Sequence, residues 1–165
     1  MSGGKGNDTL SGGAGNDRLK DTQGNNILYG DAGDDELRAG HGDDKLDGDS
    51  GNDILIAGAG DDRLNGGTGD DVLQGGSGVD RFYLSSDRDI IQDFQDGRDL
   101  LGLLTTIDGP PLSFSDLDIV QVGQNLEIRW KLEGLNDVGS QTHVIVLEGI
   151  QASQITVDDF VQITP

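Results

Sequence analysis

The chain has 165 residues, a net charge of −20 and no cysteine. So strong a negative charge disfavours nucleic acid or an anionic membrane surface as a partner, and the lack of cysteine excludes a disulfide framework and thiol chemistry. No apolar run approaches the roughly twenty residues that a transmembrane helix needs.

The N-terminal half is built from one phrase of nine residues, repeated nine times between residues 3 and 83. Its clearest copies read Gly-Gly-x-Gly-x-Asp-x-Leu-x, as in residues 12–20 and 66–74. The fourth position is glycine in all nine copies, the sixth is aspartate in eight, and the eighth is leucine in eight, followed by Phe82. Internal repetition at a short fixed period is typical of a solenoid.

The composition of the phrase predicts its local structure. Six residues rich in glycine and aspartate form a turn, because glycine adopts positive φ without steric cost. The three residues that follow form a short strand whose middle residue points inward. Two copies then make one coil of eighteen residues, and alternate strands form two parallel sheets with leucines between them. The predicted fold is all-β, a right-handed parallel β-roll about 20 Å long at the usual strand spacing.

The turns place acidic side chains in rows. Each turn stacks on the turn two copies later, so that Asp17 faces Asp35 and Asp44 faces Asp62. A row of carboxylates at strand spacing repels itself, and no lysine or arginine occupies the sixth position. A hard cation held by carboxylate and carbonyl oxygens resolves this conflict, and calcium fits better than zinc or magnesium. A disordered Gly/Asp-rich linker is the alternative, but a linker does not keep a leucine at every ninth residue.

The phrase resembles the repeat-in-toxin (RTX) nonapeptide of calcium-binding β-rolls. In that family the earlier turn of a pair gives its second and fourth carbonyls and its aspartate to the ion. The later turn gives its first and third carbonyls and its aspartate. The resemblance therefore implies one site from Gly13, Gly15, Asp17, Gly30, Ala32 and Asp35, and another from Gly58, Gly60, Asp62, Gly75, Ser77 and Asp80.

The same resemblance implies several calcium ions along the roll. The other ligands that it implies are Asp8, Gly33, Gly40, Gly42, Asp44, Gly48, Ser50, Gly51, Asp53, Ala57, Ala59, Gly66, Gly67, Thr68, Gly69, Asp71, Gly76, Gly78, Asp89 and Asp99. Asp89 is the sixth residue of a tenth copy at residues 84–92. Asp89 and Asp99 match aspartates that close the last sites after the roll of serralysin-type proteases.

Copy three departs from the pattern. Asp21 and Thr22 replace its two leading glycines, and Asn26 replaces its aspartate. Sites that share this turn lose a charge, so we expect them to be weak or empty. In later copies Ala39, Ala57, Asp31 and Asp49 replace a glycine but keep its carbonyl, and the sites there are expected to survive with some strain.

The outward strand positions differ between the two sheets. One sheet carries a column of Thr9, Ile27, Lys45, Arg63 and Arg81. Its cations are either an ordinary solvated face or an anion-binding strip. The other sheet carries an apolar patch, which we expect the rest of the chain to cover; the patch consists of Ile54, Ile56 and Val72.

Residues 1–92 are thus predicted to form the roll, and residues 93–165 a β-rich cap that covers its open end. Strands are predicted at 118–122, 125–131, 143–147 and 157–163, with a hairpin between the first two. Short helical turns are predicted at 113–117 and 152–160, and loops at 108–111 and 133–140. The acidic and apolar residues at 158–163 also resemble the end of type I secretion substrates.

Enzymatic motifs are missing from the sequence. It contains neither His-Glu-x-x-His nor Gly-x-Ser-x-Gly, and its paired carboxylates are better explained as calcium ligands than as a glycosidase pair. We therefore expect a monomeric non-enzyme, secreted through a type I system, that folds on binding calcium outside the cell. The chain is either the C-terminal piece of a larger protein or a small independent relative. The alternative function is an accessory module for anionic polysaccharide, as in alginate epimerases.

Overall fold

The computed structural model describes residues 1–83, 85–104, 113–131 and 142–163. In these residues the chain forms fifteen strands and two 3-10 turns. The strands of the repeats are β1 (Thr9–Ala14), β2 (Arg18–Lys20), β3 (Ile27–Ala32), β4 (Glu36–Arg38), β5 (Lys45–Asp47), β6 (Ile54–Ala59), β7 (Arg63–Asn65), β8 (Val72–Ser77) and β9 (Arg81–Tyr83). The elements that follow are β10 (Arg88–Ile91), β11 (Leu100–Leu104), η1 (Phe114–Asp116), β12 (Asp118–Val122), β13 (Asn125–Lys131), β14 (Thr142–Leu147), η2 (Val157–Asp159) and β15 (Phe160–Ile163).

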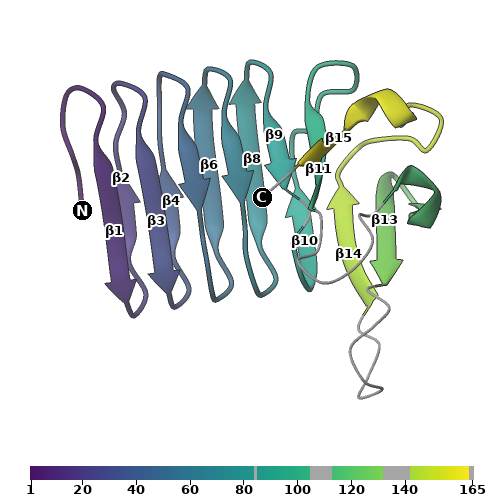
Figure 1. The fold of residues 1–165 in the computed structure, drawn as a ribbon, viewed down its shortest axis with the longest axis horizontal. Helices are drawn as coiled ribbons and strands as arrows, with labels where there is room; N and C mark the ends of the chain where they lie inside the picture. The colour runs from purple at the N-terminus through teal and green to yellow at the C-terminus, as the bar shows by residue number, and fades with distance from the viewer. Residues whose placement is uncertain (84, 105–112, 132–141, 164–165) are drawn as a thin grey trace.

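Successive strands of the repeats alternate between two sheets, as Figure 1 shows. One sheet runs β1-β3-β5-β7-β9-β11-β15, and the other runs β12-β13-β14-β10-β8-β6-β4-β2. Within the repeats every pairing is parallel and joins residues eighteen apart, such as Leu28 with Leu46 and Leu37 with Leu55. The predicted parallel β-roll with an eighteen-residue coil is confirmed.

The core of the roll consists of the eighth-position side chains, which stack in one column from each sheet and fill the space between the sheets. The eight leucines of the eighth repeat position are between 0% and 4% exposed, and Phe82 is fully buried. Each buried leucine stabilises the fold by about 2 kcal/mol. The core is thin, because only one large side chain per repeat contributes to it, so the turns matter for stability.

The C-terminal strands continue both sheets. In the first sheet β11 pairs with β9, placing Leu101 beside Phe82, and β15 pairs with β11. In the second sheet β14 pairs with β10, and β13 and β12 add antiparallel strands beyond it. Together these strands cover the end of the leucine core of the roll (Figure 1).

A larger core lies in this C-terminal part. Leu126, Ile128, Ile145 and Leu147 are at most 1% exposed, and Trp130 packs on the ring of His143 with centroids 5.5 Å apart. His143 Nδ1 also accepts a hydrogen bond of 3.1 Å from the backbone N–H of Asp87, just before β10. This contact and the β10–β14 pairing attach the C-terminal strands to the roll.

Most strands predicted beyond the repeats are present. β12 and β13 have the predicted bounds and form the predicted antiparallel hairpin, and β14 begins one residue early. The strand predicted at 157–163 is wrong in its first half, because Thr156 and Asp159 form a capping box that turns 157–159 into a 3-10 turn. Of the short helical turns expected at 152–160, the structure shows this 3-10 turn and a hydrogen-bonded turn at 152–154. The predicted loops at 108–111 and 133–140 lie outside the described residues.

The prediction that the apolar patch is covered by the rest of the chain is wrong. Ile54 remains 43% exposed, and Ile56 and Val72 are half-buried. The reason is topological, since β10 and β12–β14 extend the sheet at its end and do not cross its outer face. No helix within the described residues is long and apolar enough to span a bilayer.

Candidate metal centre

The repeat turns lie along the two long edges of the roll (Figure 1). Turns of copies one, three, five, seven and nine precede strands of the first sheet, and we call their row the odd edge. Turns of the even-numbered copies precede strands of the second sheet and form the even edge. The sixth-position residues of the odd edge are Asp8, Asn26, Asp44, Asp62 and Asp80, and those of the even edge are Asp17, Asp35, Asp53, Asp71 and Asp89.

The sixth-position carboxylates form a hydrogen-bonded ladder along each edge. On the even edge, Asp53 Oδ1 accepts from the backbone N–H of Asp35 at 2.7 Å, and Asp71 Oδ1 accepts from that of Asp53 at 2.8 Å. Asp89 and Asp99 end the ladders, since each accepts at 3.1 Å from Asp71 and Asp80 respectively. The structure thus brings these two aspartates into the rows that sequence resemblance assigned them.

The second carboxylate oxygen of most ladder aspartates has no partner among the described residues. The Oδ2 atoms of seven aspartates are shielded from solvent and accept no hydrogen bond from the described residues; they belong to Asp8, Asp35, Asp44, Asp53, Asp62, Asp71 and Asp80. Burying a charged oxygen without a partner is costly. These oxygens therefore require either protons or a cation.

The pKa values of the ladder aspartates show the same conflict. Burial, with repulsion from neighbouring carboxylates, raises the pKa of Asp53, Asp62 and Asp71 to about 7. Burial likewise raises the pKa of Asp80 and Asp89 to about 6. At neutral pH without a cation, the rows would be partly protonated and mutually repulsive.

Where a turn begins with glycine, that glycine leaves an oxygen-lined space open. A Cβ on Gly48 would lie 2.3 Å from Asp53 Oδ2 and 2.4 Å from the carbonyl oxygen of Gly66, two copies later. A Cβ on Gly30 would meet Asp35 Oδ2 at 2.6 Å and the Gly48 carbonyl at 2.7 Å. The space between two stacked turns is thus bordered by one carboxylate and one carbonyl.

Further oxygens come from the backbone. The third-position carbonyls of Ser50, Thr68 and Ser77 each accept one 2.9 Å hydrogen bond from a glycine N–H two copies earlier, which leaves each carbonyl a second lone pair. Within the described residues, no three carboxylate or imidazole side chains converge on one point. A cation between the turns would accordingly take many of its ligands from the backbone.

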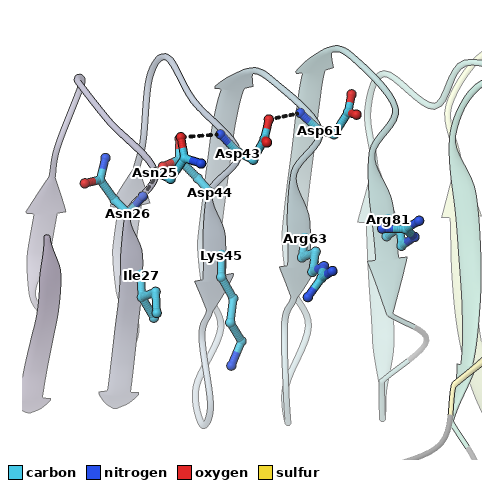
Figure 2. Close-up of a pocket in the computed structure, with 9 residues that line it drawn as sticks. All are labelled: Asn25, Asn26, Ile27, Asp43, Asp44, Lys45, Asp61, Arg63 and Arg81. Carbon is cyan, nitrogen blue, oxygen red and sulfur yellow. Dashed lines mark hydrogen bonds between the residues drawn. The ribbon is translucent and has the colours of Figure 1, made fainter. Parts of the chain in front are cut away.

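A second ladder, which sequence reasoning missed, runs along the fifth repeat positions. Asn52 Oδ1 accepts from the N–H of Asp70 at 2.9 Å, and Asp34 Oδ1 accepts from Asn52 at 3.0 Å. On the odd edge, Asp43 Oδ1 accepts from Asp61 at 3.0 Å (Figure 2). The signal was visible, because eight of nine fifth positions are Asn or Asp. This ladder fixes the stacking of the turns around the sixth-position carboxylates.

Copy three keeps the ladder but loses an oxygen. Asn26 Oδ1 still accepts from the Asp8 N–H at 3.0 Å, while its Nδ2 donates to the Gly24 carbonyl at 3.0 Å.

Two aspartates in other copies, Asp31 and Asp49, take the left-handed conformation of the glycines they replace, with φ of 71° and 68°. Such a φ strains most side chains, but aspartate tolerates it better than other residues.

The basic column has the predicted register. Lys45 pairs with Arg63 and Arg63 with Arg81 on neighbouring strands, and all three line an open groove with Asn25 and Asp61 (Figure 2). Lys45 forms an ion pair with Asp47 at 3.3 Å and a cation–π contact with Tyr29, whose ring centroid lies 5.0 Å from the Lys45 Nζ. Within the described residues, Arg63 and Arg81 form no ion pair.

Comparisons with known proteins agree with this geometry. The model of the RTX calcium-binding nonapeptide repeat (4 copies) matches residues 1–20, 21–55 and 56–91, more than half of the chain. No curated protein sequence matches the chain.

Several solved structures are similar in fold. The AlgE6R3 subunit of the Azotobacter vinelandii mannuronan C5-epimerase is 21% identical, with 96% of this chain and 80% of that chain covered and a TM-score of 0.40. The AlgE6R2 subunit is 22% identical, with 92% of each chain covered and a TM-score of 0.36. The extracellular lipase LipA from Serratia marcescens is 16% identical, with 94% and 38% covered and a TM-score of 0.44.

Proposed function

Because this chain belongs to the RTX calcium-binding nonapeptide repeat family, we propose that it is a module that binds several calcium ions between its stacked turns and folds on binding them. The observation that carries the proposal is the row of buried Oδ2 atoms that accept no hydrogen bond from the described residues. A cation satisfies all of these oxygens while the carboxylates stay charged.

Calcium suits the oxygens that border the turns. It takes six to eight oxygen ligands at about 2.3–2.6 Å from carboxylates and carbonyls. Beside Gly48, Asp53 Oδ2 and the carbonyl oxygen of Gly66 border one space, since a Cβ on Gly48 would lie within 2.4 Å of both. Asp53 would supply one carboxylate to the ion there, and Asp71, whose Oδ1 already bonds the Asp53 N–H, would supply the other. The remaining ligands would be the turn carbonyls implied by the family.

Binding and folding are coupled in this proposal. Without calcium, the net charge of −20 opposes folding, and a core with one large side chain per repeat is too thin to offset it. Each bound ion stabilises the folded state and has little affinity for the unfolded chain, where the turns are not stacked. The chain would stay loose at low cytosolic calcium, pass a type I secretion channel, and fold outside the cell. Residues 93–165 would close the roll, and no catalytic role is assigned to any residue.

A calcium titration tests the proposal. Far-ultraviolet circular dichroism should show a cooperative gain of β structure at about 10⁻⁴–10⁻³ M calcium, the range of extracellular modules, and magnesium at the same concentration should not substitute. Chelator should reverse the change. Equal β content in chelator and in millimolar calcium would contradict the proposal.

The unpaired arginines favour a second candidate function, binding of an anionic polysaccharide. Arg63 and Arg81 stand in register at strand spacing beside Lys45, so successive sugar carboxylates along a chain such as alginate could meet them in turn. Exposed contacts of this kind are individually weak and are screened by salt. Binding would therefore be modest and would require the folded roll.

A triple variant with a matched control tests this candidate. Lys45/Arg63/Arg81→Ala should lose salt-sensitive binding to short alginate oligomers in calcium. Arg18/Lys20/Arg38→Ala removes three cations from the other sheet and should retain binding. Equal binding by the two variants would leave Lys45, Arg63 and Arg81 as a solvated face.

A further inference from the structure

Copy three carries two unusual residues whose effects compensate each other. It has aspartate at the first position, where the other copies have glycine or alanine, and asparagine at the sixth, where they have aspartate. This turn therefore carries a carboxylate at the first position and none at the sixth, so that one acidic side chain remains near the ladder.

The Asp21 carboxylate is buried beside Asp8. Asp21 is 1% exposed, and its Oδ2 accepts a hydrogen bond of 2.9 Å from the N–H of Gly4 in copy one. A Cβ on Gly3 would lie 2.3 Å from Asp21 Oδ2 and 2.7 Å from the carboxyl carbon of Asp8. Both carboxylates consequently border the same space between turns one and three.

This space corresponds to the cation space of the regular turns. Beside Gly48, the corresponding point lies near the sixth-position carboxylate of its own turn and the first carbonyl of the turn two copies later. Beside Gly3, the own-turn carboxylate is Asp8, and the nearest atom from the later turn is a carboxylate oxygen of its first residue. The first residue of copy three thus presents its side chain where regular turns present a carbonyl.

Asn26 cannot supply the missing charge. Its single side-chain oxygen accepts from the Asp8 N–H, and its Nδ2 donates to the Gly24 carbonyl. Asp8 Oδ2 meanwhile remains shielded from solvent, without a partner among the described residues. Two neighbouring carboxylates, one with an unpartnered buried oxygen, favour a divalent cation between them.

We propose that Asp8 and Asp21 form a calcium site between copies one and three, with Asp21 replacing the carboxylate that Asn26 lacks. The inference rests on the proposed function, and it reverses the expectation from the repeat pattern that the Asp8–Asn26 turn pair is weak or empty. A substitution at the first position of a repeat thereby restores a site lost by a substitution at the sixth.

Ion counting on the full chain tests this site. Native mass spectrometry at saturating calcium should find one ion fewer on Asp21→Asn than on the wild type, and one fewer on Asp8→Asn. The double variant should also lose only one ion, because both residues serve the same site. Asp118→Asn, at an exposed position on β12, controls for the change in net charge and should keep the full count.

A rescue variant guards against a general folding defect. Asp21→Gly combined with Asn26→Asp restores the regular phrase and should regain the ion that Asp21→Gly alone loses. An Asp21→Asn protein that folds and binds as many ions as the wild type would overturn the inference. So would an Asp21→Gly/Asn26→Asp protein that binds no more ions than Asp21→Gly. Failure of the proposed function itself would look different, since the wild type would then bind no calcium.

Discussion

The two edges of the roll have the same ladder but different leading residues. On the even edge the first position of the turn is glycine in the four copies from Gly12 to Gly66. On the odd edge it is Gly3, Asp21, Ala39, Ala57 and Gly75 in turn. The carboxylate ladder crosses the alanine turns unchanged, since Asp62 Oδ1 accepts from Asp44 at 2.8 Å and Asp80 Oδ1 from Asp62 at 3.0 Å.

This difference shows that the hydrogen-bonded ladder and the cation space have different requirements. The ladder needs only a backbone N–H and one carboxylate oxygen, and both edges provide them. The cation space also needs an empty first position, because a Cβ on the leading glycines of the even edge would lie 2.1–3.1 Å from the Oδ2 atom of the same turn's aspartate. The Ala57 methyl is fully buried in this position, and Ala39 is 9% exposed. We therefore expect the even edge to bind calcium more tightly than the middle of the odd edge.

Removing one carboxylate from each edge should give the largest contrast. Asp53→Asn keeps the ladder oxygen but removes a charge shared by two regular turn pairs, and Asp44→Asn removes one flanked by Asn26 and Ala39. Losing a charged hydrogen-bond partner costs roughly 1.5–3 kcal/mol, which is on the order of a ten- to hundredfold weaker binding of one ion. The calcium midpoint should rise more for Asp53→Asn than for Asp44→Asn, by calcium titration followed with circular dichroism. A larger effect of Asp44→Asn would contradict tighter calcium binding at the even edge.

Exchanging glycine and alanine between the edges should have the next largest effect. Gly48→Ala places a methyl in an even-edge space without demanding a positive φ, and overpacking of this kind costs about 1–3 kcal/mol. Its calcium midpoint should rise, and that of Ala57→Gly should fall. Ala59→Gly changes the third position of the same turn and serves as the control, because Ala59 is partly exposed whereas Ala57 is fully buried. If Ala57→Gly and Ala59→Gly shift the midpoint equally, the methyl does not obstruct binding.

Acid should affect both edges in the same direction. The pKa of Asp53 and Asp71 on the even edge and of Asp62 on the odd edge is raised to about 7, against an ordinary value of 3.8. A raised pKa in the folded state stabilises that state at low pH, and the contribution is lost as pH rises through about 7. In chelator, the chain should thus hold more β structure at pH near 5 than near 8, by circular dichroism.

Calcium binding should show the opposite dependence on pH. Protons compete for the same oxygens, so the calcium midpoint should rise as pH falls over the same range. A midpoint that does not change between these pH values would show that the buried carboxylates are not the ligands.

The fifth-position ladder should give the smallest effect. Asn52→Asp keeps the oxygen that accepts from Asp70 and adds a charge at an exposed position, where electrostatic effects are at most about 1 kcal/mol. Thermal unfolding in calcium should change by no more than a few degrees. A loss of folding would mean that amides in this ladder are essential and that the sixth-position carboxylates do not dominate the turns.

The repeats were predictable because one period determines every level of their structure. The spacing of Leu28 and Leu46 sets the register, and the same spacing places Asp35 above Asp53. The C-terminal strands were predicted at nearly their observed positions, together with the β12–β13 hairpin, but the pairing of β14 and β15 with the roll was not. The residue pattern of β14 indicates a strand, but its pairing with β10 depends on contacts between residues distant in sequence. The exposed patch at Ile54 was predicted wrongly for this reason.

Two local features were missed for another reason. The fifth-position ladder consists of hydrogen bonds between exposed side chains and backbone N–H groups, which hydrophobic periodicity does not report. The burial of Asp21 beside Asp8 depends on where a first-position side chain points, which becomes visible only once the turns are stacked.

Crystals grown in calcium would locate the bound ions through their anomalous scattering. We expect a line of peaks along the even edge between successive turns, each between neighbours in the series Asp17, Asp35, Asp53, Asp71 and Asp89. The peaks should be weaker beside Ala39 and Ala57, and one should lie between Asp8 and Asp21. A folded roll with no ions between its turns, or with ions only at other surface carboxylates, would contradict this expectation.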